Sequence, residues 1–258
     1  MIRGLYASAS GMLVGQTRME VLANNLANVD TPGYKKDTVL ARAFPEMLLR
    51  RINDEVPDPS RPGVDRRPVI GRAGTGAGVD EIPTLYGQGQ IRDTANPYDL
   101  ALAGDGFLAV QAPAGERYTR QGSLARAADG RLVTRDGLEV LGEAGPIVIK
   151  GRDFQVAPDG RVFSGGEEVG RLRVVTFAST AGLRKEGNAL FAATAESGAP
   201  TPVARPGVVQ GALERANVNP IQEMVDMITT LRAYEANQRA IQVQDESLGR
   251  AVNEVGRI

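Results

Sequence analysis

The sequence predicts an α+β protein in which discontinuous long N- and C-terminal helices form a coiled-coil-like domain and an antiparallel β domain is inserted between them. The observations behind this prediction are an apolar heptad pattern near each end of the chain and a middle in which short apolar segments alternate with Asp-Gly turns. We expect an N-terminal helix within 1–34, a linker and extended region over 35–89, a β-rich domain over 90–211 and a C-terminal helix within 212–258.

The N-terminal helix is predicted from apolar residues that recur every seven positions, at Leu5, Met12, Met19 and Leu26. An adjoining face carries small residues that would let another backbone approach closely. These residues are Gly4, Ala7, Ser8, Gly11 and Gly15. The helix should end before Thr31-Pro32-Gly33, because proline disfavours a helical residue before it and glycine tolerates a positive φ.

The C-terminal helix is predicted to open at Asn219, a good N-cap, with Pro220 at the tolerated first helical position. An apolar seam follows at once and continues, after a phase shift, for about 38 residues. It comprises Ile221, Met224, Ile228, Leu231, Tyr234, Gln238, Ile241, Leu248, Val252 and Val255. A helix of this length is typical of half of a coiled coil, so we expect the two chain ends to pair with each other or with neighbouring copies. An ordinary α+β domain whose helices cover one sheet is the alternative.

Turn signals define the β domain. Asp-Gly pairs at 105–106, 129–130, 136–137 and 159–160 favour the left-handed conformations of tight hairpins. Before this domain, the stretch 53–78 is rich in Pro, Gly and Arg, and we interpret it as an extended linker or exposed loop.

Composition excludes much enzyme chemistry. The chain has no cysteine and no histidine, so it lacks thiolate nucleophiles, imidazole bases and the ordinary zinc and haem ligands other than carboxylates. The glycine-rich stretch 74–78 does not have the spacing of a phosphate-binding loop, and the adjacent carboxylates at 80–81 and 167–168 are typical of a solvated surface. We expect no enzymatic activity, no catalytic residues, no cofactor and no metal site.

Charge and hydropathy limit the partners. The 30 Lys and Arg residues nearly balance the 31 Asp and Glu residues, so no global field favours nucleic acid. No stretch of about 18 consecutive apolar residues predicts a membrane span, and the apolar residues before Ala7-Ser8-Ala9 are too few for a secretory signal. We expect neither nucleic-acid binding, nor membrane insertion, nor a cleaved signal peptide.

Three groups of motifs resemble one family. Near the N-terminus stand Ala-Asn-Asn-Leu-Ala-Asn at 23–28 and Thr-Pro-Gly-Tyr-Lys at 31–35. The middle carries motifs at 96–102, 104–107 and 118–122, and the C-terminal part carries Leu-Glu-Arg-Ala-Asn-Val-Asn at 213–219 and Arg-Ala-Tyr-Glu-Ala-Asn at 232–237. In this order they are similar to the bacterial flagellar basal-body rod protein family of the FlgF and FlgG type. The residues at 1–6 and 253–258 favour the FlgF type.

The resemblance implies a structural subunit of the bacterial flagellar basal-body rod that polymerises through its terminal helices and transmits torque from the motor to the hook. Implied partners are copies of itself, other flagellar rod and hook subunits, the surrounding basal-body rings and, in transit, the type III export apparatus. The implied location is the basal body, outside the cytoplasmic membrane. The alternatives are a hook or rod–hook junction subunit and an envelope hydrolase associated with the flagellum.

Three asparagines of the first motif have physical interpretations of their own. Asn28 could cap the helix, whereas Asn24 and Asn25 lie a turn inside it, where a hydrogen bond to a neighbouring chain is a reasonable hypothesis. We therefore expect an assembly interface made of both seams and these asparagines: Leu5, Met12, Met19, Asn24, Asn25, Leu26, Asn28, Ile221, Met224, Ile228, Leu231, Tyr234, Ile241, Leu248 and Val252.

Overall fold

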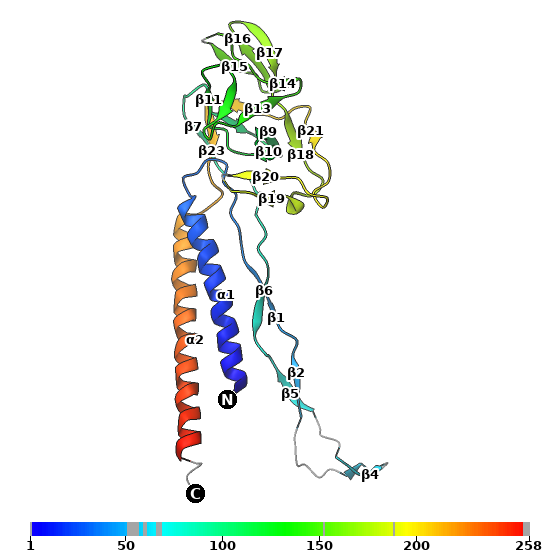
Figure 1. Ribbon diagram of the computed structural model, residues 1–258, viewed down its shortest axis with the longest axis vertical. Helices are drawn as coiled ribbons and strands as arrows, with labels where there is room; N and C mark the ends of the chain where they lie inside the picture. Colours follow the sequence, from blue (N-terminus) through cyan, green and yellow to red (C-terminus); the bar gives the residue numbers. More distant parts are fainter. Residues whose placement is uncertain are drawn as a thin grey trace. The chain divides into compact units, whose positions relative to one another are not determined.

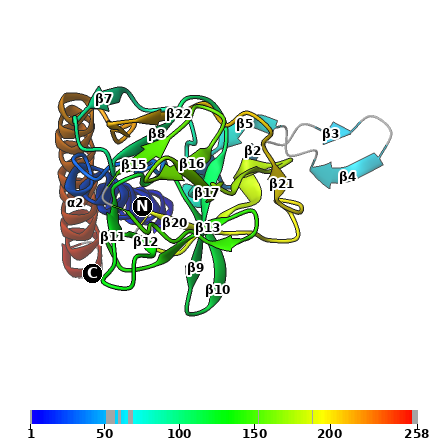
Figure 2. The ribbon, with the colours of Figure 1, turned by 90° about the horizontal axis from the view of Figure 1, so that it is seen from above.

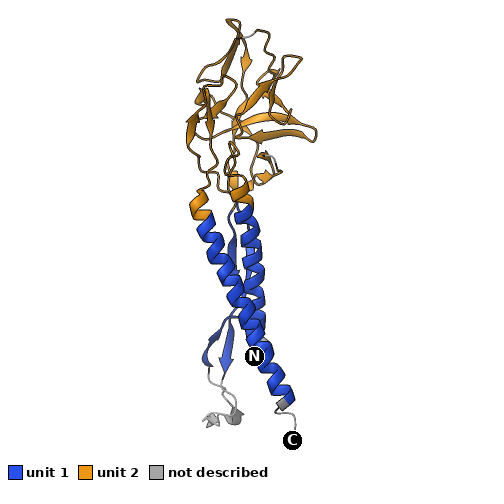
Figure 3. Ribbon diagram, turned by 90° about the vertical axis from the view of Figure 1, so that its left-hand side faces the viewer, with its two compact units in different colours: residues 1–23, 38–83, 224–258 blue, residues 24–37, 84–223 orange. Residues whose placement is uncertain are grey.

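A computed structural model of the protein describes residues 2–50, 57–58, 61–65, 69–151, 153–187 and 189–254. Helix α1 (Ile2–Ala27) and helix α2 (Pro220–Glu254) stand before and after a mostly β middle, so the predicted α+β class is confirmed (Figure 1). The chain forms two compact units (Figure 3). Unit 1 contains Met1–Ala23, Thr38–Pro83 and Met224–Ile258, and unit 2 contains Asn24–Asp37 and Thr84–Glu223. Val255 of the predicted seam lies outside the described residues.

Local signals set the helix ends where the sequence predicts them. Gly33, just after α1, has a φ of 68°, and its N–H donates to the carbonyl of Glu214 at 2.8 Å. At the start of α2, Oδ1 of Asn219 accepts hydrogen bonds from the N–H groups of Ile221 and Gln222, at 3.1 and 3.4 Å. Asn219 is therefore the N-cap. Neither helix combines the length and the apolar character that crossing a bilayer would require.

Within the stretch expected to be an extended linker, unit 1 forms three antiparallel strand pairs. Strand β1 (Leu40–Ala43) pairs with β6 (Ala77–Glu81), β2 (Met47–Arg50) with β5 (Val69–Ala73), and β3 (Pro57–Asp58) with β4 (Arg61–Asp65). The first two pairs are separate two-stranded sheets that follow one another along the same two chain segments, and we call them together the ladder. Its described side chains are mostly exposed, which explains why the strands show no clear apolar alternation in the sequence.

Unit 2 is organised around strand β9 (Phe107–Ala112). It pairs with β10 (Gly115–Thr119) as a hairpin (Figure 2), with β13 (Glu139–Gly142) and with β18 (Val174–Thr176). The same sheet also contains β11 (Leu124–Arg126), β12 (Leu132–Thr134), β14 (Gly145–Pro146), β19 (Arg184–Lys185), β20 (Leu190–Ala192) and β21 (Thr201–Pro202).

Smaller sheets and one short helix complete unit 2. A three-stranded sheet contains β15 (Phe154–Val156), β16 (Arg161–Ser164) and β17 (Glu167–Arg171). Two further pairs are β22 (Val208–Gln210) with β8 (Leu100–Leu102), and β23 (Ala212–Glu214) with β7 (Ile91–Asp93). The 3-10 helix η1 spans Thr180–Gly182. The glycines of the four predicted Asp-Gly turns, Gly106, Gly130, Gly137 and Gly160, all have positive φ values, of 147°, 86°, 82° and 87°.

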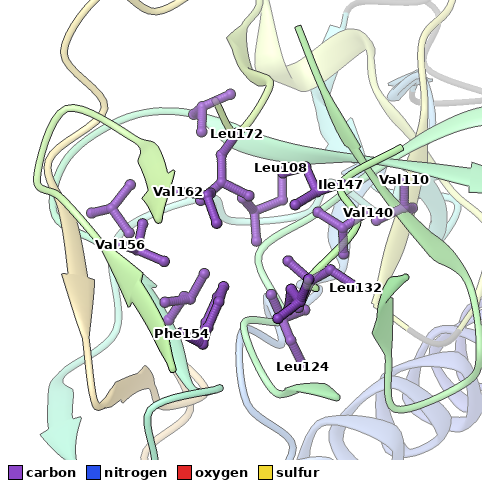
Figure 4. Packing of buried hydrophobic residues seen from close by; sticks show 14 of the residues in the cluster. Leu108, Val110, Leu124, Leu132, Val140, Ile147, Phe154, Val156, Val162 and Leu172 are labelled. Atoms are coloured by element: carbon purple, nitrogen blue, oxygen red, sulfur yellow. The ribbon is translucent and has the colours of Figure 1, made fainter. Parts of the chain in front are cut away.

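The two larger apolar clusters of unit 2 form most of its core. The larger cluster includes Leu108, Val110, Leu132, Val140 and Val162, all fully buried (Figure 4). The smaller cluster is aromatic and contains Phe107, Tyr118, Phe177 and Phe191. Each buried side chain of this size contributes roughly 1.5–3 kcal/mol of transfer free energy. These clusters give unit 2 an apolar core within its own residues.

Candidate assembly surfaces

In unit 1, α1 and α2 lie side by side (Figure 1). The small face of α1 makes the contact: a Cβ added at Gly4 would lie 2.5 Å from Nε2 of Gln244, and one at Gly11 would lie 3.0 Å from Nδ2 of Asn237. At Gly15 the nearest atom is Cδ2 of Tyr234, at 3.8 Å. The partner's number falls as the α1 number rises, so the two helices run antiparallel. We expected the two chain ends to pair either with each other or with neighbouring copies, and within the single chain they pair with each other.

The side of α2 that faces α1 is partly polar. Its half-buried or buried residues recur at intervals of three and four. They include Met227, Thr230, Tyr234, Asn237, Ile241, Gln244 and Leu248. Three residues of the predicted interface, Tyr234, Ile241 and Leu248, therefore lie on the side that the chain itself uses. Because the glycines of α1 have no side chain, the long polar and aromatic side chains of α2 can pack directly against the α1 backbone.

A different side of α2 carries exposed apolar residues, which we call the α2 stripe: Met224, Val225, Ile228 and Leu231. Their exposed fractions are 44%, 48%, 51% and 45%. The phase shift in the sequence pattern marks the change from this stripe to the side that faces α1. Ile221, in unit 2, and Val252, near the end of α2, are exposed as well. The α2 stripe is apolar surface that unit 1 leaves uncovered.

The outer face of α1 lines a second apolar surface, the α1 groove. Tyr6 and Leu13, which are absent from the predicted interface, are each 67% exposed, whereas the predicted Leu5, Met12 and Met19 are half-buried. The groove has a volume of about 570 Å³. Its lining comes from α1 and from the β1–β6 and β2–β5 ladder, and includes Arg3, Tyr6, Leu13, Val14, Phe44, Met47 and Val79.

The ladder is held against α1 by a direct hydrogen bond. Oγ of Ser10 accepts from the N–H of Ala77 at 3.2 Å. Gly76 has a φ of 127°, and a Cβ there would lie 2.3 Å from the Ser10 hydroxyl oxygen. Phe44 covers Gly78, since a Cβ at Gly78 would lie 3.0 Å from its ring. Glycine at 76 therefore allows the ladder to approach α1, and glycine at 78 leaves room for the Phe44 ring.

Unit 2 contains a buried ionic cluster, which we call the joint. The carboxylate of Glu214 accepts hydrogen bonds from Lys35 Nζ at 2.6 Å, from Arg120 Nη1 at 3.2 Å and from the N–H of Gly89 at 2.8 Å. All three ionic side chains are at most 4% exposed. Lys35 follows α1 and Glu214 precedes α2, so the joint ties together the two segments by which the chain enters and leaves unit 2.

Electrostatics identify the joint as a structural ion pair. Burial lowers the pKa of Lys35, and its hydrogen bond and charge interaction with Glu214 oppose that shift. Burial likewise lowers the pKa of Arg120, with Glu214 again opposing. Lys35 Nζ also donates to the carbonyl of Gly87, and Arg120 Nη2 to that of Gly104, at 2.9 and 2.7 Å. Both cations are thus paired and hydrogen-bonded, which is the condition for burying charge.

Asn25 belongs to a second buried network beside the joint. Its Nδ2 donates to the carbonyl of Asp37 at 2.8 Å and to Glu223 Oε2 at 3.2 Å. Its Oδ1 accepts from the N–H of Asp37 and from the hydroxyl of Tyr34, both at 3.1 Å. Lys36 completes the network with an ion pair to Glu223 at 3.1 Å. The two donors and two lone pairs of the Asn25 amide are all used within the chain, so the amide has no bond left for the neighbouring chain that the sequence suggested.

The other two asparagines lie at the end of α1. Nδ2 of Asn28 donates to the carbonyl of Asn24 at 2.9 Å, a contact compatible with the capping interpretation of Asn28. Asn24 is exposed, and its Oδ1, at 2.8 Å, shares the single hydroxyl proton of Tyr34 with Oδ1 of Asn25. Burial raises the pKa of Tyr34, and the charges of Asp37 and Glu223 raise it further. Leu26 is half-buried nearby.

Sequence reasoning missed Lys35, Arg120, Glu214 and Glu223 as a cluster. The available signal was a charged residue next to an apolar one inside each motif, as in Tyr34-Lys35 and Leu213-Glu214. Among the residues that the structure describes, no group of three His, Cys, Asp or Glu side chains could hold a metal ion. The fold and these surfaces define a class of α+β protein in which both chain ends, with a segment of paired strands, build a unit of two long helices with uncovered apolar faces, and the rest of the middle builds an inserted β unit.

Comparisons with known families place the chain within this class. The model described as "Flagella basal body rod protein" matches residues 5–35. The model for the flagellar hook protein FlgE/F/G D1 domain matches 101–164, and the model for the C-terminal part of flagellar basal body rod FlgEFG proteins matches 209–254. The three matches coincide with the two terminal motif regions and part of the β unit.

Individual relatives extend the similarity to the whole chain. The FlgG rod protein of Agrobacterium fabrum is 34% identical over 95% of this chain and 96% of its own length. The FlgF rod protein of Caulobacter vibrioides is 33% identical, and the hook-basal body complex protein FlhO of Bacillus subtilis is 32% identical, each over the full length of both chains. The chain therefore belongs to the family of flagellar basal-body rod proteins of the FlgF and FlgG type. Since FlgF and FlgG relatives match about equally well, the FlgF assignment stays a prediction.

Proposed function

We propose that the protein polymerises through its terminal helices and so forms part of the shaft that transmits torque from the flagellar motor to the hook. As a member of this family it is a structural subunit of the bacterial flagellar basal-body rod. The observation that carries the proposed mechanism is the α2 stripe, whose four apolar side chains are about half exposed on one side of a long helix.

Exposed apolar surface of this extent favours association. Covering the remaining exposed part of each stripe residue would contribute roughly 1 kcal/mol, so one subunit contact gains several kcal/mol from the stripe. Contiguous apolar patches on monomeric proteins commonly mark interaction sites. The stripe is not the same surface as the α1 groove. Contacts between unlike surfaces of identical subunits generate open helical assemblies when the rotation does not close.

In the proposed assembly, terminal helices from many subunits pack into a central coiled-coil-like tube and the β units form an outer layer. Partners would be copies of this chain, other flagellar rod and hook subunits, and the rings around the rod. We propose that the chain reaches this position outside the cytoplasmic membrane through the flagellar export apparatus, without a cleaved signal peptide. The absence of cysteine from the sequence is compatible with an oxidising compartment.

Cryo-electron microscopy of intact basal bodies tests the proposal. Density for this chain should form part of the rod, with α1 and α2 near the axis. Density found only at the rod–hook junction or in the hook would replace the proposal with the hook or junction alternative. We propose no catalytic role, since the relatives above carry the names of rod and hook-basal body proteins. A peptidoglycan turnover assay with the purified chain checks that point, because turnover would favour the envelope hydrolase alternative.

A further inference from the structure

We propose that the α1 groove of one copy receives the α2 stripe of a second copy. This inference rests on the proposed function and deepens it by naming the two surfaces that meet. Both surfaces lie within unit 1, and both are formed by apolar side chains that remain exposed in the single chain.

The groove has the chemistry of a helix-binding surface. Tyr6 and Leu13 project from one wall and Phe44 and Met47 from the other, and all four are at least 45% exposed. Arg3 is the one charged residue of its lining. Amphipathic helices bind such grooves through anchors at intervals of three and four residues. The stripe presents this spacing at Met224, Ile228 and Leu231.

A copy does not fill its own groove with its own stripe. Within one chain, α1 contacts α2 through Gly4, Gly11 and Gly15. The α2 residues opposite these glycines are Gln244, Asn237 and Tyr234. Tyr6 and Leu13 lie on the groove side of α1, and the stripe lies outside the α2 residues that meet α1. Each copy therefore offers one groove and one stripe, and every new contact leaves another pair of surfaces open.

The two surfaces match in length. The helical wall of the groove runs from Arg3 to Thr17, which is about 21 Å of helix. The stripe from Met224 to Leu231, continued by one turn to Glu235, covers about 17 Å. The stripe and its flanking glutamate thus fit within the groove wall.

The charges of Arg3 and Glu235 determine the direction in which α2 of the second copy runs along α1. Arg3 is exposed at one end of the groove, and Glu235 is exposed four residues beyond Leu231 on the same side of α2. If the incoming α2 runs antiparallel to α1, Arg3 meets Glu235, Tyr6 meets Leu231 and Leu13 meets Met224. The successive intervals are three and seven residues on α1, and four and seven on α2. The parallel direction would instead bring the Glu235 carboxylate to the apolar part of the groove, where an unpaired charge is unfavourable.

A charge exchange tests this pairing by sedimentation velocity over a concentration series. Arg3→Glu alone places two carboxylates together, and Glu235→Arg alone places two guanidinium groups together. Each variant should associate about tenfold more weakly than the unmodified chain. In an equimolar mixture, the groove of the Arg3→Glu variant meets the stripe of the Glu235→Arg variant with the two charges exchanged. The unchanged pair meets at the next contact, so association should recover.

The matched control for the charge exchange is Arg18→Glu. This substitution reverses an exposed charge of α1 that lies outside the groove lining. The Arg18→Glu variant should therefore associate like the unmodified chain.

Disulfide trapping tests the register, because the chain contains no cysteine of its own. A Leu13→Cys protein mixed with a Met224→Cys protein should form a disulfide-linked heterodimer. A Val243→Cys protein supplies the control: Val243 is also exposed on α2, but it lies about 28 Å further along the helix than Met224. If the purified chains stay monomeric, the same pairs are examined in basal bodies from cells that produce both variants.

The outcomes separate this inference from the proposed function. Undiminished association of both single charge variants, no recovery in their mixture, no crosslink between positions 13 and 224, or an equal crosslink to position 243 would each overturn the pairing of groove and stripe. None of these results would remove the chain from the rod. That conclusion would fail if this chain were missing from the rod density of intact basal bodies.

Discussion

Lys35 and Glu214 are 179 positions apart in the chain, yet Nζ of the lysine lies 2.6 Å from Oε1 of the glutamate in the core of unit 2. This pair, with Arg120, is the most deeply buried ionic contact of the described residues. The first prediction concerns its contribution to stability.

Replacing Glu214 with Gln should destabilise unit 2 by about 3–5 kcal/mol, because Lys35 and Arg120 would remain buried without the carboxylate that pairs with both. Chemical denaturation followed by far-UV circular dichroism measures the change. Glu143→Gln, which removes an exposed partner of Arg171, is the matched control and should change stability by at most about 1 kcal/mol. Equal effects of the two substitutions would contradict the importance of the joint.

Alkaline pH should destabilise unit 2 through its buried tyrosines. Burial, followed by the charge of Glu116, raises the pKa of Tyr118 from 10.0 to about 12. Between these values the unfolded chain loses the phenolic proton while the folded chain keeps it, so stability falls as pH rises. Tyr118→Phe should therefore flatten the decline in unfolding free energy over this range, relative to its value at pH 8. An unchanged slope would show that Tyr118 does not contribute to it.

Ile228→Asp and Leu231→Asp should abolish incorporation into the rod and yet change the melting of the monomer by less than about 1 kcal/mol. Both side chains are half exposed in the single chain, so their replacement removes little burial there. A rod-assembly assay and thermal melting supply the two readings. Gln242→Asp, at an exposed polar position of the same helix, should leave both unchanged. A mutant that still assembles would contradict the role of the stripe.

Gly11→Leu should separate the paired helices of unit 1, since even a Cβ there meets the Asn237 side chain at 3.0 Å. Faster amide hydrogen exchange in both helices, measured by mass spectrometry, is the expected result. Gly249→Ala is the control. Apart from the local backbone of the helix, no atom of the described residues lies within 4 Å of a Cβ added at that position, so the substitution should stabilise α2 by up to about 1 kcal/mol. Unchanged exchange in Gly11→Leu would show that the helices do not pack through this glycine.

Asn25→Ala should destabilise the chain by about 2–4 kcal/mol, because it leaves groups of Tyr34, Asp37 and Glu223 without their buried partner. Asn24→Ala, which removes one acceptor at an exposed position, should have an effect below about 1 kcal/mol. Denaturant titration of both variants makes the comparison. Similar values for the two asparagines would contradict the assignment of Asn25 to an internal network.

Both helices could be predicted from the sequence because their signals are local. A heptad pattern, the Asn219 cap and the turn at Gly33 each act within a few residues. The strand pairs of unit 1 escaped prediction because β1 and β6 are far apart in the chain and their exposed side chains give no alternation.

For a similar reason, the predicted interface did not separate the two sides of α2. Periodicity places Ile228 and Tyr234 on one continued seam, and only the packing of α2 against α1 separates an outward side from an inward one. The charged residues inside the motifs were a signal for buried charge, but the pairing of Lys35 with Glu214 could not be predicted, since nothing near Lys35 in the sequence indicates a partner at Glu214. Contacts between distant segments follow from topology, which a single sequence does not display.

The order of the joint's residues along the chain has a consequence for the timing of folding. A ribosome makes Lys35 first, Arg120 second and Glu214 last, so the carboxylate that accepts hydrogen bonds from both cations emerges when most of the chain has already been synthesised. Until then neither cation has the carboxylate with which it is buried, and this disfavours packing of the segment around residue 35 against the β strands. The ion pair with Glu214 should therefore form late in folding. The segment around Lys35 and the segment around Glu214 can pack together only after the last strands of the β unit have been synthesised.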